Sequence, residues 1–239
     1  MALTKCEKTT QRFARIAFSC LLVLTIVLLP LTSASAADKQ KDEETLRNAN
    51  LLLQDMLNSK DIAPSALSKA NCVLILPGVK KFGFGVGGSG GRGPLLCRRG
   101  EKFQGNWSAP AMYSIGGASI GLQVGGSSSD FVLLLMNSKV VNQILTGKTK
   151  MGTDASAAAG PGATAASASD ADILTYGKTK GVFAGVSLGG ATIEPDNDAN
   201  HRLYDKTVTA TEIVRGTTIK PSGEGQSLVA ALDGKLAKH

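Results

Sequence analysis

The stretch that decides how this chain folds is residues 170–204, which read DADILTYGKTKGVFAGVSLGGATIEPDNDANHRLY. From Val182 to Leu188, aliphatic residues alternate with small ones and with Phe183, a period of two that is typical of a β-strand. One face of this strand is aliphatic, and the other carries a single aromatic ring between residues almost without side chains. Such a bare face indicates the close approach of another sheet or of a flat ligand surface.

Glycine-rich alternation recurs earlier in the chain, whose 28 glycines among 239 residues exceed the usual share of about 7%. Phe82–Gly90 and Tyr113–Gly125 repeat the pattern, and Phe131–Met136 is a strand that is apolar on both faces. Because glycine lies inside strands, the sheet must curve, stack closely on another layer or stay bare on one face. We predict an α+β fold, a Gly-rich, mostly antiparallel curved sheet or partial barrel with N-terminal and C-terminal helices.

Helical spacing marks both ends of the predicted domain and one segment inside it. Asp38–Lys60 places its apolar residues on one face, Pro64 begins a short second helix, and Gln226–Ala237 closes the chain. An internal helix follows Ser138, its predicted N-cap. The buried stripe of that helix is predicted to be Val140, Val141, Ile144 and Leu145.

The region between residues 72 and 107 is predicted to hold several short strands. Val73–Leu76 ends at Pro77, and Ser89–Pro94 forms a turn. Leu95–Arg98 and Phe103–Trp107 are two further predicted strands.

Three motifs resemble catalytic or metal sites but lack a required part. The G-x-G-x-x-G spacing that begins at Gly83 is not followed by the helix that a dinucleotide-binding loop needs. Ser187 lies in a G-x-S-x-G sequence but continues a strand instead of forming a nucleophile elbow. Asp196, Asp198 and Asn200 match the start of a calcium loop whose glycine and glutamate are missing, so they are interpreted as a polar turn. We therefore predict no enzyme, no cofactor and no metal site.

Residues 1–36 have the three parts of a secretory signal peptide. Basic residues lead into an apolar run, Ile16–Leu29, and Ala-Ser-Ala precedes Ala37. The run of 14 residues is shorter than the roughly 20 that span a membrane. Export to the periplasm or the extracellular space with cleavage is predicted, and a retained signal anchor is the alternative. The mature chain, residues 37–239, shows no linker and is interpreted as a single domain.

The mature chain is mildly basic, because 22 Lys and Arg against 18 Asp and Glu give a net charge of +4. This charge favours an anionic surface, but no basic run interleaved with aromatics is present, so no nucleic-acid partner is predicted. The mature chain keeps two cysteines, Cys72 and Cys97, in apolar settings. A disulfide and two buried thiols are equal alternatives for them.

Paired basic residues lie at the predicted strand ends and turns. If the fold brings them to one rim, they form an anion-attracting surface suited to lipid head groups. The pairs are Lys80 with Lys81, Arg98 with Arg99, Lys148 with Lys150, and Lys178 with Lys180.

The opening stretch closely resembles the signature of the SYLF domain family. That signature is roughly S-Y-S-x-x-K-G-L-F-A-G-V-S-x-E-G followed by D-A-N-x-x-x-Y, and this chain has TYGKTKGVFAGVSLGG and DANHRLY. The likeness extends upstream through CVLILPGVKKFGFGVGG, SIGLQVGG, DFVLLLMN and KMGTDASAAAGP, and so covers about Ile62 to Tyr204. Val182 stands where the family pattern has leucine, and Gly189 where it has glutamate.

The resemblance implies a lipid-binding module. Eukaryotic members of the family bind phosphoinositides, and some associate with actin; a signal followed by one such domain looks like the exported bacterial kind. Actin is therefore not expected as a physiological partner. The implied function is peripheral association with anionic phospholipid membranes, and the alternative is a structural or protein-interaction module of the cell envelope without a lipid ligand. The residues expected to contact lipid are Lys178, Lys180, Phe183, Lys80, Lys81, Lys148 and Lys150.

Overall fold

The computed structural model divides the chain into two compact units, residues 1–40 and residues 41–239. The residues whose structure is described are 31–84, 86–120, 125–150, 156–158, 171–179, 182–183, 188, 190–221 and 223–236. The predicted signal run and its basic start lie outside the described residues, so the signal peptide stays a prediction.

The described residues form six helices, α2 to α7, and nine strands. The helices are α2 (Leu31–Asn58), α3 (Pro64–Lys69), α4 (Ser138–Thr146), α5 (Asn197–Tyr204), α6 (Ala210–Arg215) and α7 (Glu224–Leu236). The strands are β1 (Cys72–Phe84), β2 (Val86–Cys97), β3 (Ala111–Ile120), β4 (Gly125–Leu135), β5 (Thr149–Lys150), β6 (Ser156–Ala158), β7 (Ile173–Thr179), β8 (Val182–Phe183) and β9 (Thr192–Pro195).

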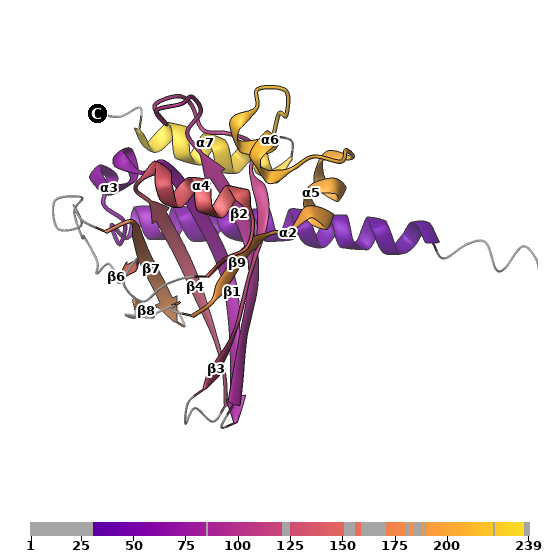
Figure 1. The fold of residues 1–239 in the computed structure, drawn as a ribbon, viewed down its shortest axis with the longest axis vertical. Helices are drawn as coiled ribbons and strands as arrows, with labels where there is room; N and C mark the ends of the chain where they lie inside the picture. The colour runs from indigo at the N-terminus through magenta and orange to yellow at the C-terminus, as the bar shows by residue number, and fades with distance from the viewer. Residues whose placement is uncertain are drawn as a thin grey trace, which may run out of the picture. The chain divides into compact units, whose positions relative to one another are not determined.

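The described strands form one sheet in the order β5-β9-β3-β2-β1-β4-β7-β6, with β8 paired to β7 beside this path. The four longest strands, β1 to β4, are antiparallel neighbours, and the short β6 is parallel to β7. The sheet curls around α4, as the ribbon views show (Figure 1). The predicted α+β fold with a Gly-rich, mostly antiparallel curved sheet is confirmed.

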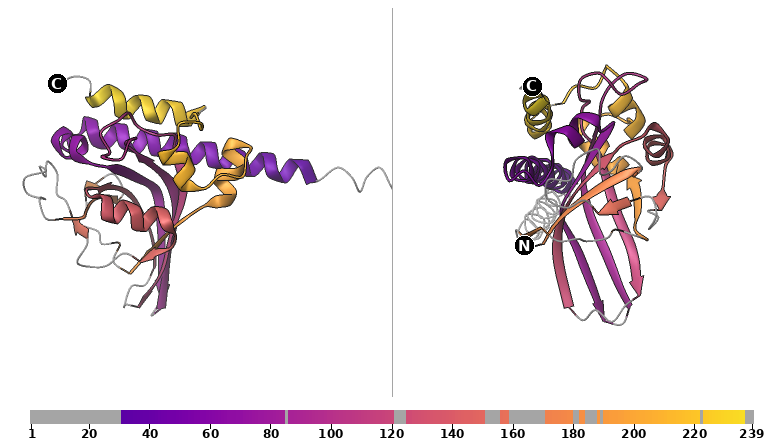
Figure 2. Two further views of the ribbon diagram at one scale, coloured as in Figure 1. Left: turned by 45° about the horizontal axis from the view of Figure 1, so that its top comes forward. Right: turned by 90° about the vertical axis from the view of Figure 1, so that its left-hand side faces the viewer.

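The helices of this unit cover the sheet on both faces. Figure 2 shows α2 and α4 on opposite sides of it. On the α2 face, Val73 and Ile75 of β1 pack with residues of α2, α3 and α7. On the α4 face, Leu74 and Leu76 pack with residues of α4 and α6. Strand alternation thus divides the aliphatic residues of β1 between two cores.

The sequence predicted that this strand ends at Pro77, and that prediction is wrong, because β1 extends to Phe84. It continues through a β-bulge, where its register with both neighbouring strands shifts. Gly78 adopts φ +63°, which favours glycine, and its N–H donates to Asp130 Oδ1 at 2.7 Å. A side chain of Asp130 thereby replaces the ladder bond that the bulge interrupts, so the strand resumes beyond it.

The predicted turn at Ser89–Pro94 is also wrong, because these residues lie inside β2. Gly93 allows β2 to pass close to the backbone of β1 before the bulge, because a Cβ built there would lie 1.8 Å from the carbonyl oxygen of Ile75. The predicted strand at Phe103–Trp107 is a series of turns with a single bridge between Arg98 and Trp107. Phe103 has a positive φ of 53°, which an extended strand does not allow.

The predicted helices at Pro64, after Ser138 and at the C-terminus are confirmed as α3, α4 and α7. The stripe predicted for α4 is fully buried, but the N-cap is Asn137, whose side chain accepts from the N–H of Val140. Helix α2 begins at Leu31, ahead of the predicted Asp38.

Two short helices, α5 and α6, form where the sequence predicted a polar turn and an undefined segment. Asp196 caps α5, and Thr209 with Glu212 forms a capping box for α6.

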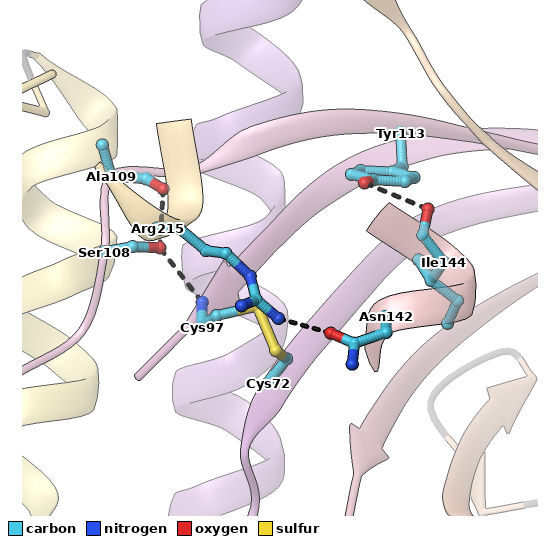
Figure 3. The surroundings of a disulfide bond; sticks show 8 residues. All are labelled: Cys72, Cys97, Ser108, Ala109, Tyr113, Asn142, Ile144 and Arg215. Carbon is cyan, nitrogen blue, oxygen red and sulfur yellow. Dashed lines mark hydrogen bonds between the residues drawn. A yellow bond between two sulfur atoms is a disulfide. The ribbon is translucent and has the colours of Figure 1, made fainter. Parts of the chain in front are cut away.

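Cys72 and Cys97 lie directly opposite each other on β1 and β2 and form a disulfide (Figure 3). This settles the alternative that the sequence left open. Both residues are fully buried on the α4 face. The hydroxyl of Ser108 accepts from the N–H of Cys97 at 3.0 Å and donates to the carbonyl of Ala109, so the backbone beside the disulfide is also paired.

Candidate functional site

The far ends of β1 to β4 extend past the helices that cover the rest of the sheet (Figures 1 and 2). We call this part the projecting sheet end. Its residues are 80–84, 86–90, 116–120 and 125–128. They are mostly glycine, serine and a few apolar residues, and the only charged residues among them are Lys80 and Lys81. The projecting sheet end therefore carries positive charge without a carboxylate.

Phe82 is the most exposed large apolar side chain of the described residues, with 66% of its surface accessible. Its ring lies across Gly88 of the neighbouring strand, where an added Cβ would be 3.0 Å from the ring. This contact leaves the outer side of the ring facing solvent. Lys80 shares the α2 face with Phe82 because the two residues are two apart on one strand, and Lys80 is exposed as well.

Lys81 points to the opposite face of β1. Its Nζ lies 5.7 Å from the centre of the Phe131 ring, a cation–π distance. The side chain is half-buried, and burial lowers the pKa of Lys81 from its ordinary value. The two lysines thus place one cation on each face of the projecting sheet end.

A groove lies between α2 and the bulge of β1. Leu51, 59% exposed, lies along it, and so do two carboxylates, Asp55 and Asp130. The groove continues toward Lys80 and Arg92. It therefore differs from the projecting sheet end in carrying both signs of charge.

Lys178 of β7 is buried, unlike the solvent-facing lysine expected from the sequence. Its Nζ lies 2.7 Å from Asp55 Oδ2 and 3.0 Å from Asp61 Oδ2. Burial opposes the charge of Lys178, but the hydrogen bonds and charges of the two aspartates raise its pKa. Burial likewise opposes the charge of Asp61, whose pKa is nonetheless lowered by hydrogen bonds from Ser59 and Lys178. This cluster ties β7 to the end of α2.

The other basic residues singled out from the sequence do not converge on one rim. Lys148 pairs with Glu194 at 3.1 Å, and Lys150 is exposed on β5, which β9, β3 and β2 separate from β1. Arg98 stacks on Trp107 at 4.6 Å, and Arg99 donates to a backbone carbonyl. Lys180 lies outside the described residues, and so does Ser187; the backbone of Phe183 pairs with Lys178, and its side chain is not described.

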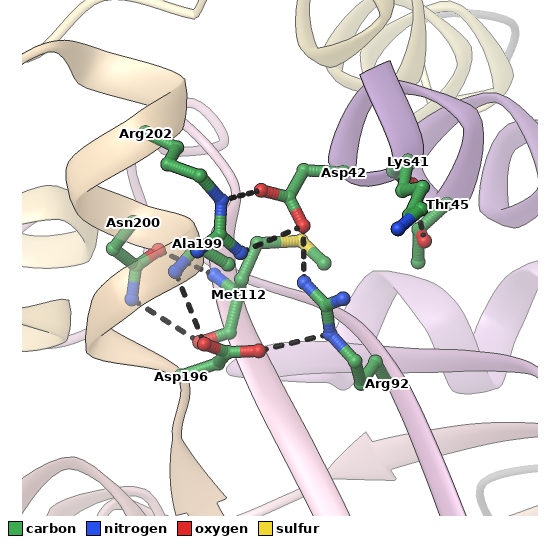
Figure 4. A network of polar contacts seen from close by, with 9 residues as sticks. All are labelled: Lys41, Asp42, Thr45, Arg92, Met112, Asp196, Ala199, Asn200 and Arg202. Carbon is green, nitrogen blue, oxygen red and sulfur yellow. Dashed lines mark hydrogen bonds and ion pairs between the residues drawn. The ribbon is translucent and has the colours of Figure 1, made fainter. Parts of the chain in front are cut away.

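A buried network of charges joins α2, β2 and α5 (Figure 4). Asp42 of α2 has no exposed surface and accepts hydrogen bonds from Arg92 and from Arg202, the latter at 2.7 Å. Arg92 also pairs with Asp196 at 2.9 Å. Each buried carboxylate oxygen has a cationic partner, which is the condition under which a buried charge is stable.

The D-A-N-x-x-x-Y part of the signature joins α5 to the sheet. Asn200 is fully buried; its Oδ1 accepts from the N–H of Met112 at 2.7 Å, and its Nδ2 donates to the carbonyl of Met112 at 3.2 Å. The hydroxyl of Tyr204 donates to the carbonyl of Pro110, and burial raises its pKa. Asp196 caps α5 by accepting from the N–H of Ala199 at 3.0 Å. The side chains of Asp196, Asn200 and Tyr204 thus cap α5 and hold it against the chain at residues 110–112.

Within the described part of the chain, no three His, Cys, Asp or Glu side chains are grouped to hold a metal ion. A search of the same residues for a helix of sufficient length and apolar character to cross a membrane found none.

Residues 116–235 match the family profile described as Ysc84, Las17-binding protein actin regulator. The chain belongs to the Ysc84 family, also called SYLF. The match runs from β3 to α7, and so includes the β3 and β4 parts of the projecting sheet end and the Asn200 and Tyr204 contacts. The family resemblance found in the sequence is confirmed.

Several relatives of this family are similar over most of this chain. An SH3 domain-containing protein of Schizosaccharomyces pombe is 33% identical over 216 residues, which is 87% of this chain and 49% of the relative. SH3 domain-containing YSC84-like protein 1 of Homo sapiens is 30% identical over 88% of this chain and 62% of its own length. LAS seventeen-binding protein 3 of Saccharomyces cerevisiae is 32% identical over 74% of this chain and 39% of its own. The chain thus spans about half the length of these relatives, whose names describe binding or an SH3 domain and not catalysis.

Sequence reasoning missed two features of the candidate site. The alternation of Phe82–Gly90 predicted a strand but not the exposure of Phe82. The position of Phe82 between Lys81 and a glycine-rich run without carboxylates was the signal that could have indicated an exposed apolar side chain. The Asp42 network gave no signal, because its partners Arg92 and Arg202 are 50 and 160 residues away along the chain.

Proposed function

We propose that this protein binds peripherally to anionic phospholipid membranes, and that the projecting sheet end is the binding surface. The observation that carries the proposal is the exposed Phe82 ring beside Lys80 and Lys81 on a sheet end whose residues include no carboxylate. A cation near an anionic membrane surface contributes about 1 kcal/mol, so two lysines account for roughly a thirtyfold preference for anionic over neutral lipid. The proposal includes export, as the predicted signal peptide requires.

The proposal narrows the set of basic residues expected from the sequence. Lys178 is held by Asp55 and Asp61, and Lys148 by Glu194, so neither is included. Lys150 is exposed but lies on β5, with three strands between it and β1, which makes it a useful comparison.

Vesicle flotation at low salt tests the proposal with the mature chain from Ala37. We expect binding to vesicles of equal parts phosphatidylcholine and phosphatidylglycerol, weak binding to phosphatidylcholine alone, and loss of binding as salt screens the charges. Lys80→Ala with Lys81→Ala should weaken binding about thirtyfold, whereas Lys148→Ala with Lys150→Ala should change it little. Equal binding to both vesicle types, or equal loss in both double variants, would contradict the proposal. Melting curves check that each variant is folded.

The second candidate function is a protein-interaction module. Two observations favour it: one relative is named for binding the protein LAS seventeen, and the groove beside α2 presents the exposed Leu51. If the folded protein associates with no vesicle of either charge, this second candidate becomes the better proposal.

A further inference from the structure

We propose that the projecting sheet end enters the membrane with its strand ends first, so that Phe82 lies at the boundary between head groups and acyl chains while Lys80 stays at head-group level. This inference rests on the proposed function and adds to it a pose and an apolar anchor. It makes the protein a monotopic binder whose inserted element is a sheet end and not an amphipathic helix.

The spacing along β1 suits this pose. Lys80 and Phe82 lie on one face, two residues apart, and a strand rises about 3.3 Å per residue, so they differ in depth by roughly 7 Å. An element that lies in the interface buries its apolar part by about 5–10 Å. A lysine side chain at the upper position can extend its ammonium group to the phosphates while its stem stays beside apolar atoms.

The backbone around Phe82 is paired on both sides, so it can enter a medium without water. Strand β1 is an inner strand there, with Phe82 opposite Gly88 on β2 and opposite Gly126 on β4. Its backbone polar groups therefore have partners in the sheet, which is required of any backbone that enters lipid. The glycines beside Phe82 add no side chain that must be desolvated.

The alternative pose, with the α2 face lying flat on the membrane, is disfavoured by charge. That face would bring Leu51 to the lipid together with Asp55 and Asp130, which line the same groove. An anionic surface repels both carboxylates, and removing them from water is costly. The projecting sheet end carries no such group, so Phe82 and Leu51, the two exposed large apolar residues in the described part of the chain, are predicted to differ in depth.

Depth-dependent fluorescence quenching by brominated lipids tests this pose. Phe82→Trp and Leu51→Trp place the same reporter at each of these exposed positions, and the single native tryptophan, Trp107, is buried and serves as the background. The mature chain is used, with the full chain beside it, on vesicles of equal parts phosphatidylcholine and phosphatidylglycerol. We expect a blue shift and strong quenching by shallow bromines for Phe82→Trp, and neither change for Leu51→Trp. Phe82→Ser should weaken vesicle binding about tenfold or more, and Leu51→Ser should not.

The outcomes separate this inference from the proposed function. Charge-dependent flotation with no quenching of Phe82→Trp overturns insertion and leaves the proposed function standing. Equal quenching at positions 51 and 82 overturns the pose with the strand ends first, in favour of the flat pose. Absence of flotation for every folded variant overturns both proposals together.

Discussion

The two ends of strand β1 differ in the burial and the size of the side chains on and around them. From Cys72 to Leu76, every residue is fully buried, and aliphatic side chains fill a core on each face. Beyond the bulge, Lys80 and Phe82 face solvent, and the partner strands opposite them are glycine and serine. The backbone ladder nevertheless runs through both parts. The comparison teaches that packing fixes the covered part, whereas the projecting sheet end is held mainly by its backbone pairing, which leaves Lys80 and Phe82 exposed for a partner.

The largest expected effect on stability comes from the buried charges that fasten the helices to the covered part. Asp42→Ala leaves Arg92 and Arg202 without their buried partner, and breaking such a cluster typically costs about 3–5 kcal/mol. Urea unfolding measures this loss. The matched control is Asp198→Ala, an exposed aspartate in the first turn of α5, which should cost less than about 1 kcal/mol. Similar losses in both variants would show that the network contributes no more than a surface charge.

Lysine substitutions on the two parts of the sheet should differ clearly. Lys178→Met leaves Asp61 buried without its cation and should cost about 2–3 kcal/mol in urea unfolding. Lys80→Met, on the projecting sheet end, should change stability by less than about 0.5 kcal/mol. If the two variants lose equal stability, the contrast between a structural and an available lysine is wrong.

The same cluster predicts a pH dependence. The folded pKa of Asp61 lies below its ordinary value of 3.8, so its contribution to stability is complete above that value and is lost as pH falls through the folded pKa. The raised pKa of Lys178 gives a contribution that is complete below 10.5 and is lost as pH rises through the folded pKa. Stability curves of the wild type and Lys178→Met should therefore differ most between these limits and converge in acid.

A smaller contrast is expected for two glycines of β2. The Cβ of Gly93→Ala would meet the carbonyl oxygen of Ile75 at 1.8 Å, so the bulge must shift, at a cost of about 1–3 kcal/mol. For Gly90→Ala the nearest atom is 3.9 Å away, and the change should stay within about 0.5 kcal/mol. Melting temperatures of the two variants provide the measurement. A large loss for Gly90→Ala would mean that the projecting sheet end is packed as tightly as the covered part.

The local patterns of this sequence predicted what depends on near neighbours. The periodic stripe of α4 and the continuous apolar run of β4 are both buried as expected. Pro77 misled the prediction, because a bulge closed by Asp130 lets a strand pass a residue that usually ends one. Lys178 misled it for a different reason: Asp55 lies 123 residues away along the chain, and the fold alone makes the pair.

The disulfide has a consequence for the order in which the hairpin of β1 and β2 forms. Cys72 and Cys97 are 25 residues apart and lie opposite each other at the covered base of that hairpin, so the closed loop contains its entire length. An ordinary hairpin starts at its turn, but the turn region here is rich in glycine, which loses the most conformational entropy on ordering. In the oxidised chain the bond removes about 3 kcal/mol of loop-closure entropy and sets the register at the base. The hairpin should then zip from the base toward the tip, and the residues proposed to meet the membrane should be the last to order.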